Sequence, residues 1–237
     1  MCTAPTLLTL DTALNGCSAG IFKGTPENGY YEDKAMARGQ AEALWPMIER
    51  VRNQAGIAYH HIDGVAVTCG PGNFTGLRIA LTAARTFCRM QALPAYGLST
   101  AHSIAFRYCC NQQGRAKTRN CDVLVALDTK RGDYYTQAFS ANCKALEQPT
   151  IRHAQAIYAL LQANTHTLLI GHGLEDVVAD APESLTGHIA HAQLDMRPMP
   201  EMMAAMCFGG YVQAGVSDDL HPVYMREAET SLVQRKK

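Results

Sequence analysis

Apolar and polar positions follow two different periods along the first hundred residues. Short apolar runs bounded by turns such as Asn15-Gly16 and Asn28-Gly29 predict strands, whereas apolar residues spaced three and four apart between Ala41 and Ala55 predict an amphipathic helix. The predicted elements are three strands, a helix, a strand and a helix, over residues 7–11, 17–22, 30–33, 41–55, 65–68 and 77–90. A loop and a short strand then lead to Ser99-Thr100, which is typical of the N-cap of a further helix.

The second half of the chain repeats this arrangement. It predicts a strand, its hairpin partner, a helix, a strand, a short helix and a final helix, over residues 123–128, 134–139, 154–162, 167–170, 174–180 and 200–215. A strand–hairpin–helix unit that occurs twice predicts an α/β fold of two related lobes, with mixed sheets flanked by helices. We expect an N-terminal lobe over residues 1–105 and a C-terminal lobe over residues 106–237, with the last helix packing back on the first lobe.

The composition indicates a cytoplasmic protein. Apolar residues make up 47% of the 237 residues, so the chain can bury a sizeable core without disulfides. Its 21 basic and 21 acidic residues cancel, which disfavours a protein that grips nucleic acid alone, because such proteins carry a basic excess. The nine cysteines form no CxxC pair, which indicates free thiols in a reducing cytosol. We expect neither a signal peptide nor a membrane span, since the N-terminus lacks a charged segment before its short apolar run.

The segment between the strand at 65–68 and the helix at 77–90 carries the most specific pattern. Three glycines and a proline at residues 70–76 let the backbone approach something closely, either a phosphate or a packed neighbour. The glycine spacing is one residue longer than the dinucleotide-binding pattern, and no lysine follows as in a P-loop. Arg78 lies in the first helical turn, where a cation needs an anionic partner, either a phosphate or a carboxylate. These residues alone favour neither phosphate contact nor a structural turn.

Two aspartates end corresponding strands of the two halves. Asp11 and Asp128 each follow an apolar run and precede a turn. A carboxylate at such a position can hold a metal-bound phosphate, but an Asx turn that closes the strand is the simpler interpretation. Their repetition indicates duplication more than a two-metal site. Asp11, together with Gly72 and Thr75 of the glycine segment, is a candidate for a position close to a nucleotide.

The chain shows no set of residues that points to catalysis or metal binding. Residues 97–101 approach the G-x-S-x-G elbow of hydrolases, but His102 lies three residues after Ser99 and cannot act as the distant base of a triad. We expect Ser99 or Thr100 to cap the following helix instead. The nine histidines have no metal-ligand spacing, and no two of them are four residues apart. We therefore expect no catalytic residue and no metal ligand.

Several segments together resemble one protein family. Residues 70–79 closely resemble the GPGSFTGLRIG signature of the TsaB (YeaZ) proteins. Matches to their IDTA…CS, SExLLPxI, GVST, AIDARRGE and PxYLR motifs occur in the same order, at residues 10–18, 42–48, 97–100, 126–132 and 222–226. The sequence departs from the family pattern at Gln40-Ala41, where many relatives have His-Ser, and at Asn73, where they have Ser. The resemblance covers nearly the whole chain.

The resemblance implies a fold, a function and a set of partners. Family members have two lobes of the actin/Hsp70/sugar-kinase (ASKHA) type, and they help to place threonylcarbamoyl on the adenosine next to the anticodon of ANN-decoding tRNAs. TsaB is the non-catalytic partner of TsaD, which performs the transfer, and the ATPase TsaE joins them. The chain is thus expected to be an accessory subunit, not an enzyme, and to meet tRNA only indirectly. ATP or ADP and metal would belong to the partner subunits, with no cofactor bound by this chain alone. TsaD-type proteins carry an HxxxH metal motif that this sequence lacks.

The resemblance also implies where the partner docks. Family members pair with TsaD through helices of the N-terminal lobe, and the same surface is expected to form homodimers when TsaD is absent. The candidate interface residues are Leu44, Trp45, Ile48, Val51, Phe74, Arg78, Leu81 and Arg85. Trp45 is the single tryptophan of the chain and the candidate anchor, because partly exposed aromatic residues dominate interfaces.

Two alternatives from other functional classes stay open at this point. The first is an ATP-dependent small-molecule kinase of the same fold, which would need both phosphate loops and an adenosine pocket. The second is a glycoprotease-type peptidase, which would need Ser99 as its nucleophile.

Overall fold

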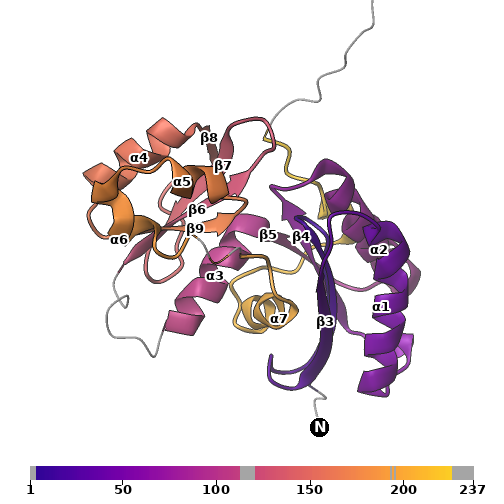
Figure 1. Ribbon diagram of the computed structural model, residues 1–237. Helices are drawn as coiled ribbons and strands as arrows, with labels where there is room; N and C mark the ends of the chain where they lie inside the picture. Colours follow the sequence, from indigo (N-terminus) through magenta and orange to yellow (C-terminus); the bar gives the residue numbers. More distant parts are fainter. Residues whose placement is uncertain (1–3, 113–120, 193, 195, 226–237) are drawn as a thin grey trace, which may run out of the picture.

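The computed structural model describes residues 4–112, 121–192, 194 and 196–225, and it has two lobes that each contain a β-sheet (Figure 1). The sheet of the first lobe has the strand order β3-β2-β1-β4-β5. Its strands are β1 (Thr6–Asp11), β2 (Gly16–Lys23), β3 (Gly29–Ala35), β4 (Gly64–Gly70) and β5 (Ala95–Ser99). Strands β1, β2 and β3 form an antiparallel meander, whereas β4 and β5 continue the sheet parallel to β1.

Helices cover both faces of the first sheet, which explains why its strands β1 and β4 are buried along their whole length. Leu8 belongs to the core beneath α1 (Gln40–Ala55) and α2 (Phe74–Gln91), which contact β2, β3 and β4. Its neighbour Leu7 belongs to the core on the other face, beneath α7 (Pro200–Phe208). The last long helix among the described residues thus packs against the strands of the first lobe.

The second lobe repeats the topology of the first. Its strands are β6 (Asp122–Asp128), β7 (Tyr134–Phe139), β8 (Thr150–Arg152) and β9 (Thr167–His172), and its helices are α4 (Ala154–Ala163), α5 (Glu175–Ala179) and α6 (Thr186–Ile189). The strand order β8-β7-β6-β9, with β6 antiparallel to β7 and parallel to β9, matches the order β3-β2-β1-β4 of the first sheet. The expected α/β fold of two lobes, with mixed sheets flanked by helices, is confirmed.

Helix α3 (Thr100–Gln112) connects the two lobes and contacts strands of both, namely β4, β5, β6, β7 and β9 (Figure 1). The expected division at residues 105 and 106 falls inside this helix and stays a prediction. Short 3-10 turns at Tyr59–His61, Glu183–Leu185 and Ser217–Asp219 complete the described secondary structure.

Most predicted elements are present, with boundaries that differ by at most three residues. The final helix is an exception, because α7 ends at Phe208 and not near residue 215. Gly209 and Gly210 follow it, and Gly210 adopts a φ of 72° that stops a right-handed helix. The edge strand β8 was not predicted, because three mostly polar residues give no periodic signal. In the described part of the chain, no helix combines the length and the apolar composition needed to cross a membrane.

Candidate functional site

The glycine segment links β4 to α2, and the backbone amides of Asn73, Thr75 and Gly76 form hydrogen bonds within the protein. The Asn73 side-chain oxygen accepts hydrogen bonds from the amides of Thr75 and Gly76, at 3.0 and 3.3 Å, and so caps α2. The Asn73 amide itself donates to the carbonyl of Ala13 at 2.7 Å. A phosphate at this helix N-terminus would have to compete with these bonds, because they occupy the amides that would cradle it.

Two of the glycines allow the turn after β1 to lie directly against α2. A Cβ atom on Gly72 would overlap the carbonyl oxygen of Ala13, and one on Gly76 would overlap that of Thr12. The Thr12 hydroxyl also donates to the carbonyl of Gly76 at 2.6 Å. Of the two interpretations that the sequence left open, close packing is the one that these contacts support.

Asp11 forms the Asx turn expected at the end of β1. It is 2% exposed, and its carboxylate accepts hydrogen bonds from the Ala13 amide, at 3.2 Å, and from the Thr68 hydroxyl. Burial raises the pKa of the Asp11 carboxyl to about 6, and the two hydrogen bonds offset only part of this effect. Asp128 repeats the turn at the end of β6, where it accepts from the Lys130 amide at 2.7 Å and forms an ion pair with the Lys130 ammonium.

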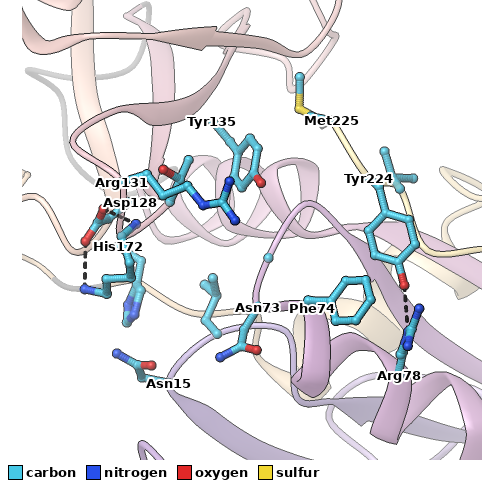
Figure 2. Close-up of a pocket in the computed structure, with 15 residues that line it drawn as sticks. Asn15, Asn73, Phe74, Arg78, Asp128, Arg131, Tyr135, His172, Tyr224 and Met225 are labelled. Carbon is cyan, nitrogen blue, oxygen red and sulfur yellow. Dashed lines mark hydrogen bonds and ion pairs between the residues drawn. The ribbon is translucent and has the colours of Figure 1, made fainter. Parts of the chain in front are cut away.

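A cleft of about 590 Å³ separates the two lobes, and we call it the interlobe cleft (Figure 2). Its lining includes Asn15, Gly72, Asn73, Phe74 and Arg78 from the first lobe, Asp128, Thr129, Lys130, Arg131, Tyr135 and His172 from the second, and Val223, Tyr224 and Met225 from the C-terminal segment. Of the three residues expected close to a nucleotide, Gly72 lines the cleft, Asp11 is buried and does not line it, and Thr75 lines a different cavity. The structure does not bring these three side chains together at one surface.

The C-terminal segment packs across the glycine segment, so two of the matched motifs are in contact. The Val223 amide donates to the carbonyl of Cys69 at 2.7 Å, and the Tyr224 ring lies 5.0 Å from that of Phe74. The Arg78 guanidinium lies 3.7 Å from the centre of the Phe74 ring and donates to the Tyr224 hydroxyl at 3.0 Å (Figure 2). Within the described residues, Arg78 is therefore held by two aromatic rings and not by the internal carboxylate that we considered, since a cation also binds an aromatic face.

A second cavity, of about 580 Å³, is the groove between α1 and α2. It is lined by Ala41, Leu44, Trp45, Phe74, Thr75, Arg78, Ile79, Thr82, Ala83 and Thr86. The Trp45 side chain is 50% exposed and its ring stacks on Phe87 at 5.4 Å and on Tyr59 at 6.2 Å. Phe74 is 46% exposed and, with Arg78, lines both the groove and the interlobe cleft.

The structure divides the predicted interface residues into two groups. Trp45, Phe74 and Arg78 are exposed in the groove, and Leu44 lies at its base. Ile48, Val51 and Leu81 are at most 1% exposed and belong to the core, so naming them as interface residues was wrong for this structure. Arg85 donates to the carbonyl of Leu220 in the C-terminal segment. Helical periodicity identified the stripe that faces the sheet, whereas the groove also uses Ile79, Thr82, Ala83 and Thr86 on the other side of α2.

Ser99 has the capping role that the sequence predicts. Its hydroxyl accepts a hydrogen bond from the His102 amide at 3.3 Å, at the start of α3. The His102 ring stacks on Phe139 at 5.3 Å, and burial lowers the pKa of this imidazole. No group of three or more histidine, cysteine, aspartate or glutamate side chains that could hold a metal occurs among the residues that the structure describes.

Comparisons with known proteins agree with the sequence motifs. The family described as "TsaD: tRNA N6-adenosine threonylcarbamoyltransferase" matches residues 34–180, more than half of the chain. The tRNA threonylcarbamoyladenosine biosynthesis protein TsaB of Escherichia coli (strain K12) is 29% identical over 129 residues, which cover 54% of this chain and 52% of that protein. The TsaB protein of Bacillus subtilis (strain 168) is 26% identical over 207 residues, which cover 81% and 82%. The chain spans about half the length of the E. coli relative.

A solved structure shows the same fold. YeaZ from Pseudomonas aeruginosa superimposes with a TM-score of 0.76 and 21% sequence identity, over 93% of this chain and 100% of that one. The matched profile, the TsaB relatives and the shared fold all agree with the motif order along the sequence. The chain therefore belongs to the TsaB (YeaZ) family.

Proposed function

We propose that this chain is a non-catalytic subunit required for threonylcarbamoyladenosine formation on ANN-decoding tRNAs, and that it acts by binding a TsaD-type transferase, which TsaE joins. The observation that carries the proposal is the groove between α1 and α2, an exposed and largely apolar surface on the first lobe. The names of the E. coli and B. subtilis relatives support the same biosynthetic role.

The groove has the features of a protein-docking surface. Its exposed aromatic residues, Trp45 and Phe74, line the groove together with the small residues Thr82, Ala83 and Thr86 of α2. Contiguous exposed apolar area of this kind marks interaction sites. Stacking on Phe87 and Tyr59 fixes the Trp45 ring before any partner arrives, which reduces the entropy lost on binding. We propose that TsaD occupies the groove, and that a second copy of this chain occupies it when TsaD is absent.

Several groups that catalysis would need have structural roles instead. Ser99 caps α3, which argues against a peptidase nucleophile. The amides of Thr75 and Gly76 donate to the Asn73 side chain and the Asn73 amide donates to Ala13. Asp11 is buried, and both observations argue against the kinase alternative. We therefore propose that the bound nucleotide and metal required for the transfer belong to the partner subunits.

The test is co-purification of this chain with the TsaD of the same organism, followed by a tRNA-modification assay with TsaD and TsaE. We expect a 1:1 complex, and modification only when this chain is present. Trp45→Ala should weaken the complex by roughly thirtyfold or more, because a buried interface tryptophan typically contributes 2 kcal/mol or more. Tyr30→Ala is the matched control, since Tyr30 is 51% exposed on β3 outside the groove.

Two results would contradict the proposal. One is a failure of the two proteins to co-elute at micromolar concentrations. The other is a Trp45→Ala complex as tight as that of Tyr30→Ala, which would move the interface away from the groove.

A further inference from the structure

Two cysteines from distant parts of the sequence meet at the helix that connects the lobes. Cys109 lies on α3, and Cys143 lies in the turn that follows β7 of the second lobe. The Cys143 thiol donates to the carbonyl of Ala105 at a sulfur–oxygen distance of 3.7 Å. Ala105 and Cys109 are four residues apart on one helix and therefore share a face. The Cys143 sulfur thus lies over the helical turn that carries Cys109, and both side chains pack in the same apolar cluster.

The turn after β7 holds Cys143 against α3. Cys143 adopts a φ of 59°, in the left-handed region that a residue with a side chain rarely occupies. Its amide donates to the carbonyl of Ser140 at 2.8 Å, and the Ser140 amide donates to the carbonyl of Lys144 at 2.8 Å, which closes the turn. Glycine or asparagine is the usual residue at such a position. The chain therefore keeps a cysteine here at a conformational cost, with its sulfur directed at α3.

The two sulfurs differ in the way that thiol–disulfide exchange requires. Cys109 is partly exposed, and a hydrogen bond from the Cys143 side chain lowers the pKa of its thiol. Cys143 is only 7% exposed, and the hydrogen bond to Cys109 raises the pKa of its own thiol. By contrast, burial raises the pKa of Cys69 and Cys88 to about 11 and that of Cys207 to about 12. An accessible cysteine beside a shielded one is the arrangement of a reactive thiol and its resolving partner.

We propose that Cys109 and Cys143 are a redox-active pair, which a low-molecular-weight disulfide such as glutathione disulfide converts to an intramolecular disulfide. The Cys109 thiolate attacks one sulfur of the small disulfide, whose S–S bond breaks and releases one thiolate. The Cys143 thiol then loses its proton, its sulfur attacks Cys109, and the mixed disulfide breaks to release the second small thiolate. The two protein thiols are oxidised, the small disulfide is reduced, and the two cysteine protons end on the two released thiols.

The disulfide joins a turn of the second lobe to the helix that contacts both lobes (Figure 1). A covalent link between α3 and the turn after β7 restricts the unfolded chain, so oxidation is expected to stabilise the protein. Neither cysteine lines the groove between α1 and α2. The redox pair therefore does not depend on the proposed docking of TsaD, and each proposal can fail without the other.

The experiment treats the full chain with glutathione disulfide and measures its intact mass and, after protease digestion, its cross-linked peptides. We expect the chain to lose two hydrogen atoms and to yield a linked peptide pair that contains Cys109 and Cys143. Reduction with dithiothreitol should separate this pair again. The thermal midpoint of unfolding should rise by about 5 °C or more on oxidation.

Single variants identify the two sulfurs. Cys143→Ser should stop the reaction at the mixed disulfide, so the peptide with Cys109 should carry one glutathione. Cys109→Ser should prevent both the mixed disulfide and the cross-link at this site, and it keeps the test independent of how well Cys143→Ser folds. Cys110→Ser is the matched control, because Cys110 is also a partly exposed cysteine of α3, and it should form the cross-link as the unmodified chain does.

Three results would overturn the proposal. The first is an unmodified chain that is not oxidised at millimolar glutathione disulfide. The second is a glutathione adduct on Cys109 that persists without closing to the intramolecular disulfide. The third is a cross-link that joins Cys109 or Cys143 to another cysteine, such as Cys110 or Cys207.

Discussion

Arg197 and Asp33 form a bidentate ion pair that connects the segment before α7 to the edge strand β3. Its two nitrogen–oxygen distances are 2.9 and 3.0 Å, and each side chain is only 16% exposed. The carbonyl of Arg197 also accepts a hydrogen bond from Arg107 of α3 at 2.9 Å. This pair therefore links the edge of the first sheet to the two helices that cover its second face.

Removing one partner of this pair should destabilise the fold. Arg197→Ala leaves the Asp33 carboxylate in a poorly solvated position, so we expect a loss of about 3 kcal/mol in the free energy of unfolding. Urea denaturation measures the loss. The control is Arg89→Ala, because Arg89 pairs with Asp218 where the two side chains are 66% and 72% exposed, and it should cost less than about 1 kcal/mol. Equal losses in the two variants would mean that the buried Arg197–Asp33 pair contributes no more to stability than an exposed ion pair does.

Local sequence signals predicted the fold well, because each relies on neighbours along the chain. The strands of both sheets other than β8, and helices α1, α2 and α4, follow from periodicity. The Ser99 cap follows from its position before an apolar stretch. The repetition of Asp11 and Asp128 correctly indicated two lobes of related topology.

Sites that depend on contacts between distant segments could not be predicted in this way. The hydrogen bond from Arg78 to Tyr224 joins residues 146 positions apart. The residues around Arg78 and those around Tyr224 show no pattern that predicts this contact. Periodicity also identifies the buried stripe of a helix more readily than its exposed face, which is why Ile48 and Leu81 were named and Thr82, which lines the groove, was not.

The buried Asp11 carboxyl should make stability depend on pH. Its pKa is raised from 3.8 to about 6 in the folded protein, so the folded state binds the proton more tightly than the unfolded state. The stabilisation from the protonated form is fully present below about pH 4 and is lost as the pH rises through about 6.

Asp11→Asn tests this dependence, since the amide oxygen can still accept the bonds from Ala13 and Thr68 that the carboxylate accepts. Near pH 4 the two proteins should be similarly stable. At pH 7.5 the variant should be the more stable by up to about 3 kcal/mol, in chemical denaturation at both pH values. If the difference in stability between the variant and the unmodified protein were the same at both pH values, a group other than Asp11 would cause the pH dependence.

The close approach of α2 to the turn after β1 predicts a steep cost for a single methyl group. In Gly76→Ala the added Cβ would overlap the backbone carbonyl of Thr12, which cannot move without disturbing β1. We expect a loss of about 2 kcal/mol or more in the free energy of unfolding. Gly187→Ala is the control, because its added Cβ meets no atom within 4 Å beyond its chain neighbours and its own helix backbone. Thermal melting should separate the two variants clearly, and similar melting temperatures would argue against tight packing at Gly76.

Asn73 stands where the family signature has serine, and its cap on α2 predicts which substitutions it tolerates. Asn73→Ser keeps an oxygen that can accept from the Thr75 and Gly76 amides, so stability should change by less than about 0.5 kcal/mol. Asn73→Ala removes the acceptor and should cost about 1 kcal/mol. If the alanine variant were as stable as the serine variant, the Thr75 and Gly76 amides would not depend on this side chain and would be available to a phosphate. Phosphate titration of Asn73→Ala completes the test, because new binding there would mean that the cap itself had blocked a phosphate site.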